Sequence, residues 1–248
     1  MRIAFISDIH IKKPGDKGSQ CLERFCENEL VLNSEEIYFL GDIFDFLVGE
    51  HSEHFEYYSK EFGFITSLLS LEKKVYFIQG NHDFHFQKTF LEFLKKNVKH
   101  YSNFIFLENG HERTFKKKKV YICHGDEVDF YNKAFKRWKK IYTASWFNYL
   151  VSKIFSYKFL IKLGSWASQN SKNRGKKTFD YELMKEKYIR GAKALLGQKK
   201  VDIIIAGHTH ILENQTYDDG RQYINNGHPV KDNKFILLED DSVSLKSL

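Results

Sequence analysis

Proline and cysteine are scarce in this 248-residue sequence, which contains two prolines, 15 glycines and three cysteines. So few prolines and glycines exclude collagen-like and low-complexity chains. Cys21, Cys26 and Cys123 are too few for a disulfide framework, and their spacing fits no zinc knuckle, so we expect a reducing compartment. The sequence shows no secretory signal pattern and no run of about 20 apolar residues. We therefore expect neither secretion nor a membrane-spanning helix.

Hydrophobic residues make up 42% of the chain and charged residues 29%, proportions typical of a globular protein. Five short runs of β-branched, aliphatic and aromatic residues predict strands that are buried on both faces. These runs cover residues 3–6, 37–40, 75–78, 120–123 and 203–206. Helical patterns cover residues 19–31, 55–71, 86–96 and 180–196. The alternation predicts an α/β protein, and turn sequences at 218–220 and 225–227 predict hairpins after His210.

Residues 131–178, which we call the basic segment, contain no acidic residue. They hold twelve of the 39 lysines and arginines, none of the 32 aspartates and glutamates, and all three tryptophans (Trp138, Trp146 and Trp166). A run of one charge sign is often only a solvated face. Together with tryptophan it also fits a surface for lipid head groups, nucleotides or nucleic acid. Composition alone leaves both interpretations open.

The basic segment also carries an apolar stripe at helical spacing, formed by Phe147, Leu150, Val151, Ile154 and Phe155. It lies between the fourth and fifth predicted strands. We therefore expect a core made of residues 1–130 and 179–248, with residues 131–178 inserted as a helical cap over one edge of the site.

Polar side chains follow all five predicted strands, at the strand ends where ligands collect in open α/β sheets. They supply two carboxylates, one amide and four imidazoles: Asp8, His10, Asp42, Asn81, His124, His208 and His210. Mixed nitrogen and oxygen ligands suit Mn, Fe, Zn or Co rather than Ca or a thiolate site. Seven ligands are too many for one catalytic ion, so the set predicts two ions that share a bridging carboxylate.

The motifs Asp-x-His, Gly-Asp-x-x-Asp, Gly-Asn-His-Asp, a single His and Gly-His-Thr-His occur in this order between residues 5 and 210. This pattern resembles the calcineurin-like metallophosphoesterases. The resemblance implies a four-layer αββα sandwich of two mixed sheets, with helices outside. It implies that the first metal is held by Asp8, His10, Asp42 and His210. It also implies that Asp42 bridges to a second metal, which is held by Asn81, His124 and His208.

Three neighbouring acidic and imidazole groups receive supporting roles under the same resemblance. Asp45 and Asp83 are interpreted as groups that orient ligands or the loop backbone. His82 follows the predicted ligand Asn81, so it could protonate a leaving oxygen or donate a hydrogen bond to a phosphate, and the alternative is a structural histidine. We therefore expect Asp42, Asn81 and His82 to be catalytic.

A narrower resemblance rests on residues 40–46, 80–84 and 124–126, followed by the basic helical insertion. These stretches are similar to the UDP-2,3-diacylglucosamine pyrophosphatases of bacterial lipid A synthesis. The resemblance implies hydrolysis of the substrate to UMP and 2,3-diacylglucosamine 1-phosphate with two divalent ions, Mn²⁺ first among Mn, Fe, Zn and Co. It implies a cytoplasmic protein that contacts the anionic inner face of the cell membrane, with no nucleic-acid partner. Expected substrate contacts are Asn81, His82, Asp129, Ser171, Arg174, Lys177 and His208.

Two alternatives stay open. The best-known pyrophosphatases of this kind carry Arg where this chain has His82, which leaves room for a metallophosphoesterase of other specificity, such as a nucleotide phosphodiesterase or a phosphomonoesterase. The other alternative is a non-catalytic scaffold that binds nucleic acid or membrane through the basic segment. The complete set of metal-binding residue types argues against a scaffold.

Overall fold

Two large sheets form the centre of the computed structural model, which describes residues 1–130, 132–164 and 180–248. The first sheet has the strand order β13 (Ser242–Ser247), β12 (Lys234–Glu239), β1 (Arg2–Ile6), β2 (Glu36–Phe39), β4 (Lys74–Ile78) and β6 (Phe104–Leu107). The second has the order β10 (Leu212–Thr216), β11 (Gln222–Asn226), β9 (Ile203–Ala206), β8 (Lys118–Ile122) and β7 (His111–Phe115). Both sheets mix parallel and antiparallel pairs. A separate parallel pair consists of β3 (Leu47–Val48) and β5 (Asp83–Phe84).

The two sheets pack face to face, and central strands such as β1, β2 and β9 are buried on both faces. In β1, Ile3 and Phe5 join the core between the sheets, whereas Ala4 and Ile6 join the core on the outer face of the first sheet. This division follows from the two-residue period of a strand. The second sheet contributes apolar side chains such as Ile205 to the core between the sheets.

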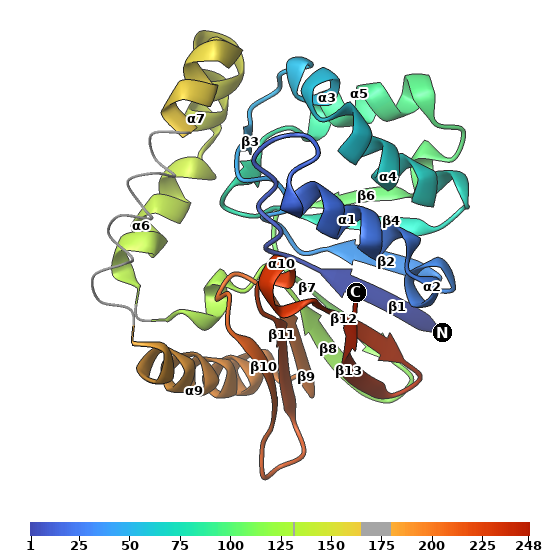
Figure 1. The fold of residues 1–248 in the computed structure, drawn as a ribbon. Coiled ribbons are helices and arrows are strands. Elements are labelled where there is room, and N and C mark those ends of the chain that lie inside the picture. The colour runs from blue at the N-terminus through green and yellow to red at the C-terminus, as the bar shows by residue number, and fades with distance from the viewer. Residues whose placement is uncertain (131, 165–179) are drawn as a thin grey trace.

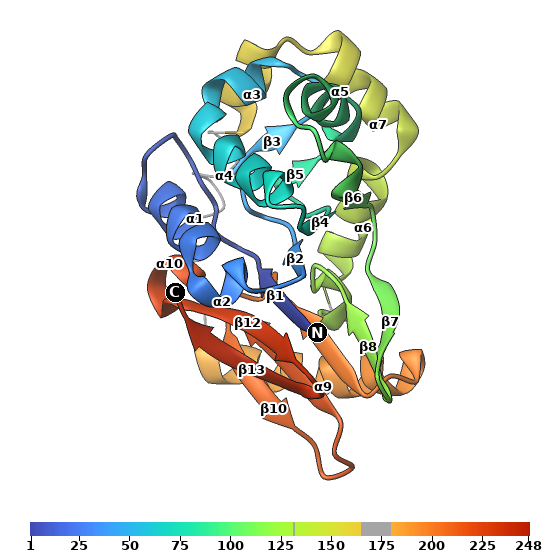
Figure 2. The same cartoon turned by 90° about the vertical axis from the view of Figure 1, so that its right-hand side faces the viewer.

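Helices cover the two outer faces (Figures 1 and 2). The first sheet is covered by α1 (Lys17–Glu27), α2 (Glu29–Leu32), α3 (Glu53–Tyr57), α4 (Ser59–Ser70) and α5 (Gln87–Asn97). The second sheet is covered by α9 (Tyr181–Lys199), whose Leu195 and Leu196 pack in a third core with Ile204. This order of layers confirms the predicted αββα sandwich.

The five predicted strands are present with shifts of one or two residues at their ends, but two predicted helices are interrupted. Asn28 divides the expected helix 19–31, because its side chain accepts a hydrogen bond from the N–H of Leu30 and so begins α2. Tyr58, with φ −101° and ψ 33°, separates α3 from α4 within the expected helix 55–71.

The hairpin predicted around residues 218–220 is confirmed, because it joins the antiparallel strands β10 and β11. The turn predicted at 225–227 is wrong. Asn225 and Asn226 end β11 and are fully buried, and the chain continues through α10 (Pro229–Asp232) into β12. Buried hydrogen bonds of the two asparagine side chains favour the strand, as described below.

The described part of the basic segment is helical. It contains α6 (Lys133–Tyr142), α7 (Ser145–Tyr149), a π-helical turn (Leu150–Ile154) and helical residues from 157 to 164. Figure 1 shows α6 and α7 beside the body, on the side toward which β1 runs. Of the predicted apolar stripe, Val151 is buried but Ile154 is 56% exposed, because the π-helical turn changes the helical period.

Two 3₁₀ turns complete the described elements, at Tyr101–Asn103 and Asp126–Val128. Across the described ranges, no helix combines the length and the apolar character that crossing a membrane requires.

Candidate metal centre

The loops after β1, β2, β4, β8 and β9 meet at one edge of the two sheets, and they bring all seven predicted ligands together. Asp8 and His10 follow β1, Asp42 follows β2, and Asn81 follows β4. From the second sheet, His124 follows β8, and both His208 and His210 follow β9. The carboxyl ends of the neighbouring parallel strands therefore build a single centre.

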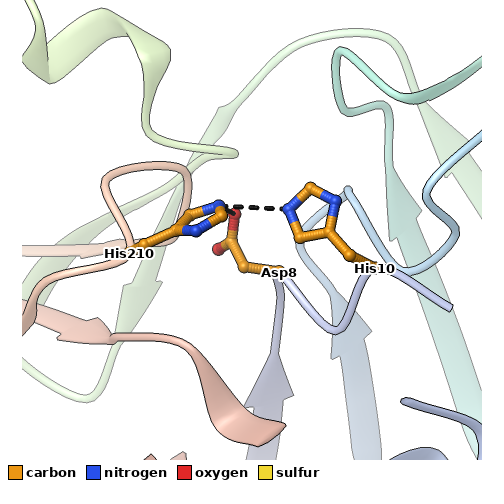
Figure 3. Close-up of side chains that lie close together, drawn as sticks. All are labelled: Asp8, His10 and His210. Carbon is orange, nitrogen blue, oxygen red and sulfur yellow. Dashed lines mark hydrogen bonds and ion pairs between the residues drawn. The ribbon is translucent and has the colours of Figure 1, made fainter. Parts of the chain in front are cut away.

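Asp8, His10 and His210 form the first group of converging side chains (Figure 3). His210 Nε2 lies 3.2 Å from Asp8 Oδ1 and 3.1 Å from His10 Nε2. Asp8 Oδ2 accepts hydrogen bonds from the Ser7 hydroxyl and from the N–H of His208. Asp8 Oδ1 is buried and has no hydrogen-bond partner in the described part of the chain. This oxygen is therefore available to a bound ion.

Asp42, His124 and His208 form the second group. His208 Nδ1 and Asn81 Oδ1 each lie 3.1 Å from His124 Nε2. The other nitrogen of His124, Nδ1, donates a hydrogen bond of 2.7 Å to the carbonyl oxygen of Leu40. That bond fixes the ring and places the Nε2 lone pair toward the centre.

The side chain of Asp42 lies between the two groups. Its Oδ1 accepts hydrogen bonds of 2.9 Å from the N–H groups of Asn81 and His82. Its Oδ2 lies 3.8 Å from His10 Nε2 and 3.7 Å from His124 Nε2. One oxygen is thus held by the backbone while the other faces one imidazole of each group, as a bridging carboxylate requires.

The electrostatics favour the metal-binding protonation states of Asp8, Asp42 and His208, whereas the neighbouring carboxylates outweigh burial and raise the pKa of His124 and of His210. Burial opposes ionisation of Asp8, but the close contact and positive charge of His210 outweigh it and hold the pKa of Asp8 below its ordinary value. Burial likewise opposes ionisation of Asp42, and His124 and His82 lower the pKa of its carboxyl group. Burial and the neighbouring His124 lower the pKa of His208 to about 4, so that ring is neutral near pH 7.

The donor set fits divalent cations. Ring nitrogens held 3.1 Å apart direct lone pairs at each other unless a proton or a cation lies between them. Ligand atoms that share one ion at about 2.1 Å are separated by about 3 Å. Imidazole nitrogens with carboxylate and amide oxygens suit first-row transition metals rather than Ca. The residues therefore fit two metal sites joined by Asp42.

Most of the ligands lie on backbone with left-handed dihedral angles, which is uncommon outside glycine. Five of the seven have a positive φ, between 54° and 69°: Asp8, His10, Asp42, His208 and His210. The turns are also crowded. A Cβ atom added to Gly80 would lie 2.3 Å from Asp42 Oδ1, and one added to Gly207 would lie 2.0 Å from Ser7 Oγ. Glycine at these two positions lets the loops approach each other closely.

Asp83 and Asp45 support the ligand loops from behind. The fully buried Asp83 accepts hydrogen bonds from the N–H groups of Asp42, Gly80 and Ile43, at 2.7 to 3.1 Å. Burial and the charge of Asp42 raise the pKa of Asp83 to about 7. Asp45 Oδ1 lies 3.6 Å from His10 Nδ1. Both residues thus occupy positions from which they orient ligands.

His82 lies at the edge of the centre, with its ring centroid 4.8 Å from that of His10. Its Nδ1 donates a hydrogen bond of 2.8 Å to the carbonyl oxygen of Asp45. This bond leaves the opposite ring nitrogen, Nε2, on the side of the ring that faces away from the Asp45 carbonyl group.

Several residues that support the centre were missed by sequence reasoning. Asn226 Nδ2 donates to the carbonyl oxygen of Ser7 at 3.3 Å, and Asn225 Nδ2 donates to the carbonyl oxygen of Gly207 at 2.6 Å. These bonds tie the end of β11 to the ligand loops. His228 follows, with its ring 5.4 Å from that of His210. The signal was present in the sequence, because polar residues also follow the apolar pair Tyr223 and Ile224.

Of the remaining predicted substrate contacts, Asp129 belongs to the described residues and three others do not. Asp129 is buried, and its Oδ1 lies 3.1 Å from Lys187 Nζ on α9. Ser171, Arg174 and Lys177 fall outside the described residues.

The basic segment reaches the centre through α6. The ring of Phe135 lies 4.9 Å from that of His208, and Lys139 Nζ lies 2.7 Å from Asp126 Oδ2.

The chain is similar to known phosphoesterases. Residues 1–212 match the family described as Calcineurin-like phosphoesterase. The chain is 28% identical over 224 residues to a UDP-2,3-diacylglucosamine hydrolase from Wigglesworthia glossinidia brevipalpis, which covers 88% of this chain and 84% of that protein. It is 26% identical over 212 residues to the protein of the same name from Histophilus somni strain 129Pt, covering 83% and 82%. A solved structure described as a novel archaeal phosphodiesterase aligns over all of both chains with a TM-score of 0.47 and 14% identity.

Proposed function

The chain belongs to the calcineurin-like phosphoesterase family and is a metal-dependent phosphoric ester hydrolase, and we propose that it hydrolyses the diphosphate of UDP-2,3-diacylglucosamine to UMP and 2,3-diacylglucosamine 1-phosphate. The observation that carries the proposal is a complete dinuclear ligand set in a chain that matches hydrolases of this name over more than four-fifths of its length.

Two ions, Mn²⁺ in our proposal, would be held by the two groups described above. Asp8, His10 and His210 hold one ion, Asn81, His124 and His208 hold the other, and Asp42 holds both. When bound, a pair of divalent ions lowers the pKa of water and neutralises charge on phosphoryl oxygens.

The side chains of the protein contribute to catalysis in two ways: they position the bridging carboxylate, and they donate a proton. Hydrogen bonds from Asn81 and His82 hold Asp42 Oδ1, so Oδ2 keeps its place between the groups. His82 Nδ1 is engaged by Asp45, which aims Nε2 outward. With both ring nitrogens protonated, His82 donates from Nε2 a hydrogen bond to a phosphoryl oxygen or a proton to the leaving oxygen.

The basic segment supports a lipid-bearing substrate. We propose that it is a cap whose aromatic side chains receive acyl chains while its cations meet phosphates or an anionic membrane surface at the inner face of the cell membrane. Trp146 and Tyr149 are 58% and 61% exposed, and Phe159 is 48% exposed, although all three are large and largely apolar. Exposed apolar groups beside lysines are typical of surfaces that bind lipid.

One reaction tests the proposed function. Purified protein loaded with Mn²⁺ is incubated with UDP-2,3-diacylglucosamine in ¹⁸O-water, and the masses of the products are measured by mass spectrometry. We expect UMP that carries the label and unlabelled 2,3-diacylglucosamine 1-phosphate. Label in the lipid phosphate would mean that water attacks the other phosphorus. Turnover of simple nucleotide diesters without turnover of the diacylated substrate would assign a phosphodiesterase of other specificity.

A further inference from the structure

A cavity of about 480 Å³ opens directly beside the first ligand group. Its wall includes His208 and His210, two of the predicted metal ligands. His228 and Lys231 line it from the start of α10, and Tyr181 lines it from the start of α9. A molecule held at the metal centre can therefore extend into this cavity without leaving the protein surface.

His228 presents a hydrogen-bond donor to the cavity. Its Nδ1 is buried and has no hydrogen-bond partner within residues 1–130, 132–164 and 180–248. Its ring packs 5.4 Å from that of His210 and 6.3 Å from that of His10. A proton on Nδ1 would face no acceptor, so the N–H lies on Nε2, the ring atom that is not buried.

The other groups in the wall make the cavity suitable for an anion. Lys231 adds an exposed ammonium group, one turn of helix beyond His228. Asp232 also lines the cavity, but its Oδ2 accepts the backbone N–H of His228 at 2.7 Å, so its charge is engaged at the start of α10. A histidine donor and a lysine at one wall are a common arrangement for binding phosphate.

We propose that this cavity binds the second phosphate group of a diphosphate substrate through His228 and Lys231, while the reacting phosphoryl group lies at the metal centre. The identity of the substrate as a diphosphate rests on the proposed function. The inference adds a specificity role: these two residues distinguish a diphosphate from a single phosphodiester. It assigns them no part in metal binding, so their replacement leaves the metal content unchanged.

Binding of two nucleotides measures this distinction. Calorimetry on Mn²⁺-loaded protein gives the affinities for α,β-methylene-UDP, which has two phosphates and resists hydrolysis, and for UMP. We expect the wild-type protein to prefer the diphosphate. In His228→Phe and in Lys231→Met this preference should fall about tenfold each, and about a hundredfold in the double variant, because each removes one hydrogen bond to a charged phosphate. Lys234→Met, three residues beyond Lys231 and bonded to Ser247, should keep the wild-type preference.

The outcomes separate this inference from the proposed function. Equal losses of affinity for both nucleotides, a fall in metal content, or a double variant within twofold of the wild-type preference would overturn the phosphate site. A wild-type protein that binds both nucleotides equally, or neither, would overturn it as well. Failure to hydrolyse UDP-2,3-diacylglucosamine would instead remove the proposed substrate, and the ratio of the two nucleotide affinities would still decide the role of the cavity.

Discussion

Hydrogen bonds from many backbone N–H groups to buried carboxylates hold the metal centre, whereas apolar packing and a few hydrogen bonds from core side chains hold the basic segment. At the centre, Asp83 accepts from four neighbouring N–H groups and Asp42 accepts from two more. In the basic segment, Tyr142, Val151 and Leu160 pack on Val48 and Phe84, and many aromatic side chains stay exposed. A centre fixed by its backbone resists changes elsewhere, whereas an element attached by a few side chains can change without disturbing it. We therefore expect chemistry and lipid affinity to respond to different substitutions.

The largest effect should come from the residue that joins the two ligand groups. Asp42→Asn removes the charge that faces both His10 and His124, so metal content should fall and turnover of every substrate should decrease by about a thousandfold or more. Metal analysis and kcat on a chromogenic phosphodiester measure both. Asp218→Asn, the same change at an exposed turn, is the control. A variant that retains two metals and a near-normal rate would refute the bridging role.

The second effect should be confined to the lipid substrate. Replacing residues 133–175 with a short Gly/Ser linker should preserve metal binding and hydrolysis of a small chromogenic phosphodiester. Activity on the diacylated nucleotide should fall by about a thousandfold, because each CH₂ buried from two acyl chains contributes about 0.8 kcal/mol.

This deletion also uncovers Val48 and Phe84, so a milder variant is needed. Trp146→Ser with Tyr149→Ser changes only exposed side chains and should weaken binding to anionic vesicles and raise KM for the lipid substrate alone. Equal losses on both substrates would show that the basic segment has a structural role instead.

A smaller effect should appear in the pH dependence of stability, and it should come from the contact between the core and the basic segment. Burial lowers the pKa of His54 to about 4, and its ring packs 5.0 Å from that of Tyr157. The unfolded chain binds this proton near pH 6.5, so the stabilisation is complete above pH 6.5 and is lost as the pH falls toward 4. Over this pH range the free energy of unfolding should fall by about 3 kcal/mol in total. Urea unfolding of the wild type and His54→Gln at pH 7.5 and 5 measures it, and the wild type should lose more stability.

The smallest effect should come from the ion pair that fastens α6 beside the centre. Lys139→Met removes the contact with Asp126 and should cost about 1 kcal/mol, since the pair is only partly buried. We expect faster hydrogen exchange in α6 and a KM for the lipid substrate raised a few-fold, with kcat unchanged. Exchanging the two residues, Asp126→Lys with Lys139→Asp, should recover part of the loss. A change in kcat instead would show that α6 also orders the metal centre.

The sequence was sufficient to predict the parts of this protein that depend on local pattern. Each of the five strands that precede the ligands is a continuous apolar run, and each ligand follows its strand within a few residues. These five strands and the converging side chains could therefore be inferred. The bond between Ser7 and Asn226 could not, because these residues are 219 positions apart and Asn-Asn-Gly is also a common turn sequence. The π-helical turn near Val151 could not be predicted either, because the spacing of apolar residues fits a regular helix, and Val151 packs with Val48, which is far away in the sequence.

The positive φ angles of Asp8, His10, Asp42, His208 and His210 limit which sequences could ever encode this centre. Aspartate, asparagine and histidine are the residues other than glycine that most readily adopt this backbone, and they are also good ligands for these metals. Glutamate and cysteine offer equally suitable ligand atoms but tolerate the backbone less well. Two requirements therefore restrict the residue type at these five positions: the side chain must bind the metal, and the backbone must tolerate a positive φ. We expect a change such as Asp42→Glu to be disfavoured by the second requirement, even where the longer carboxylate could still reach both ions.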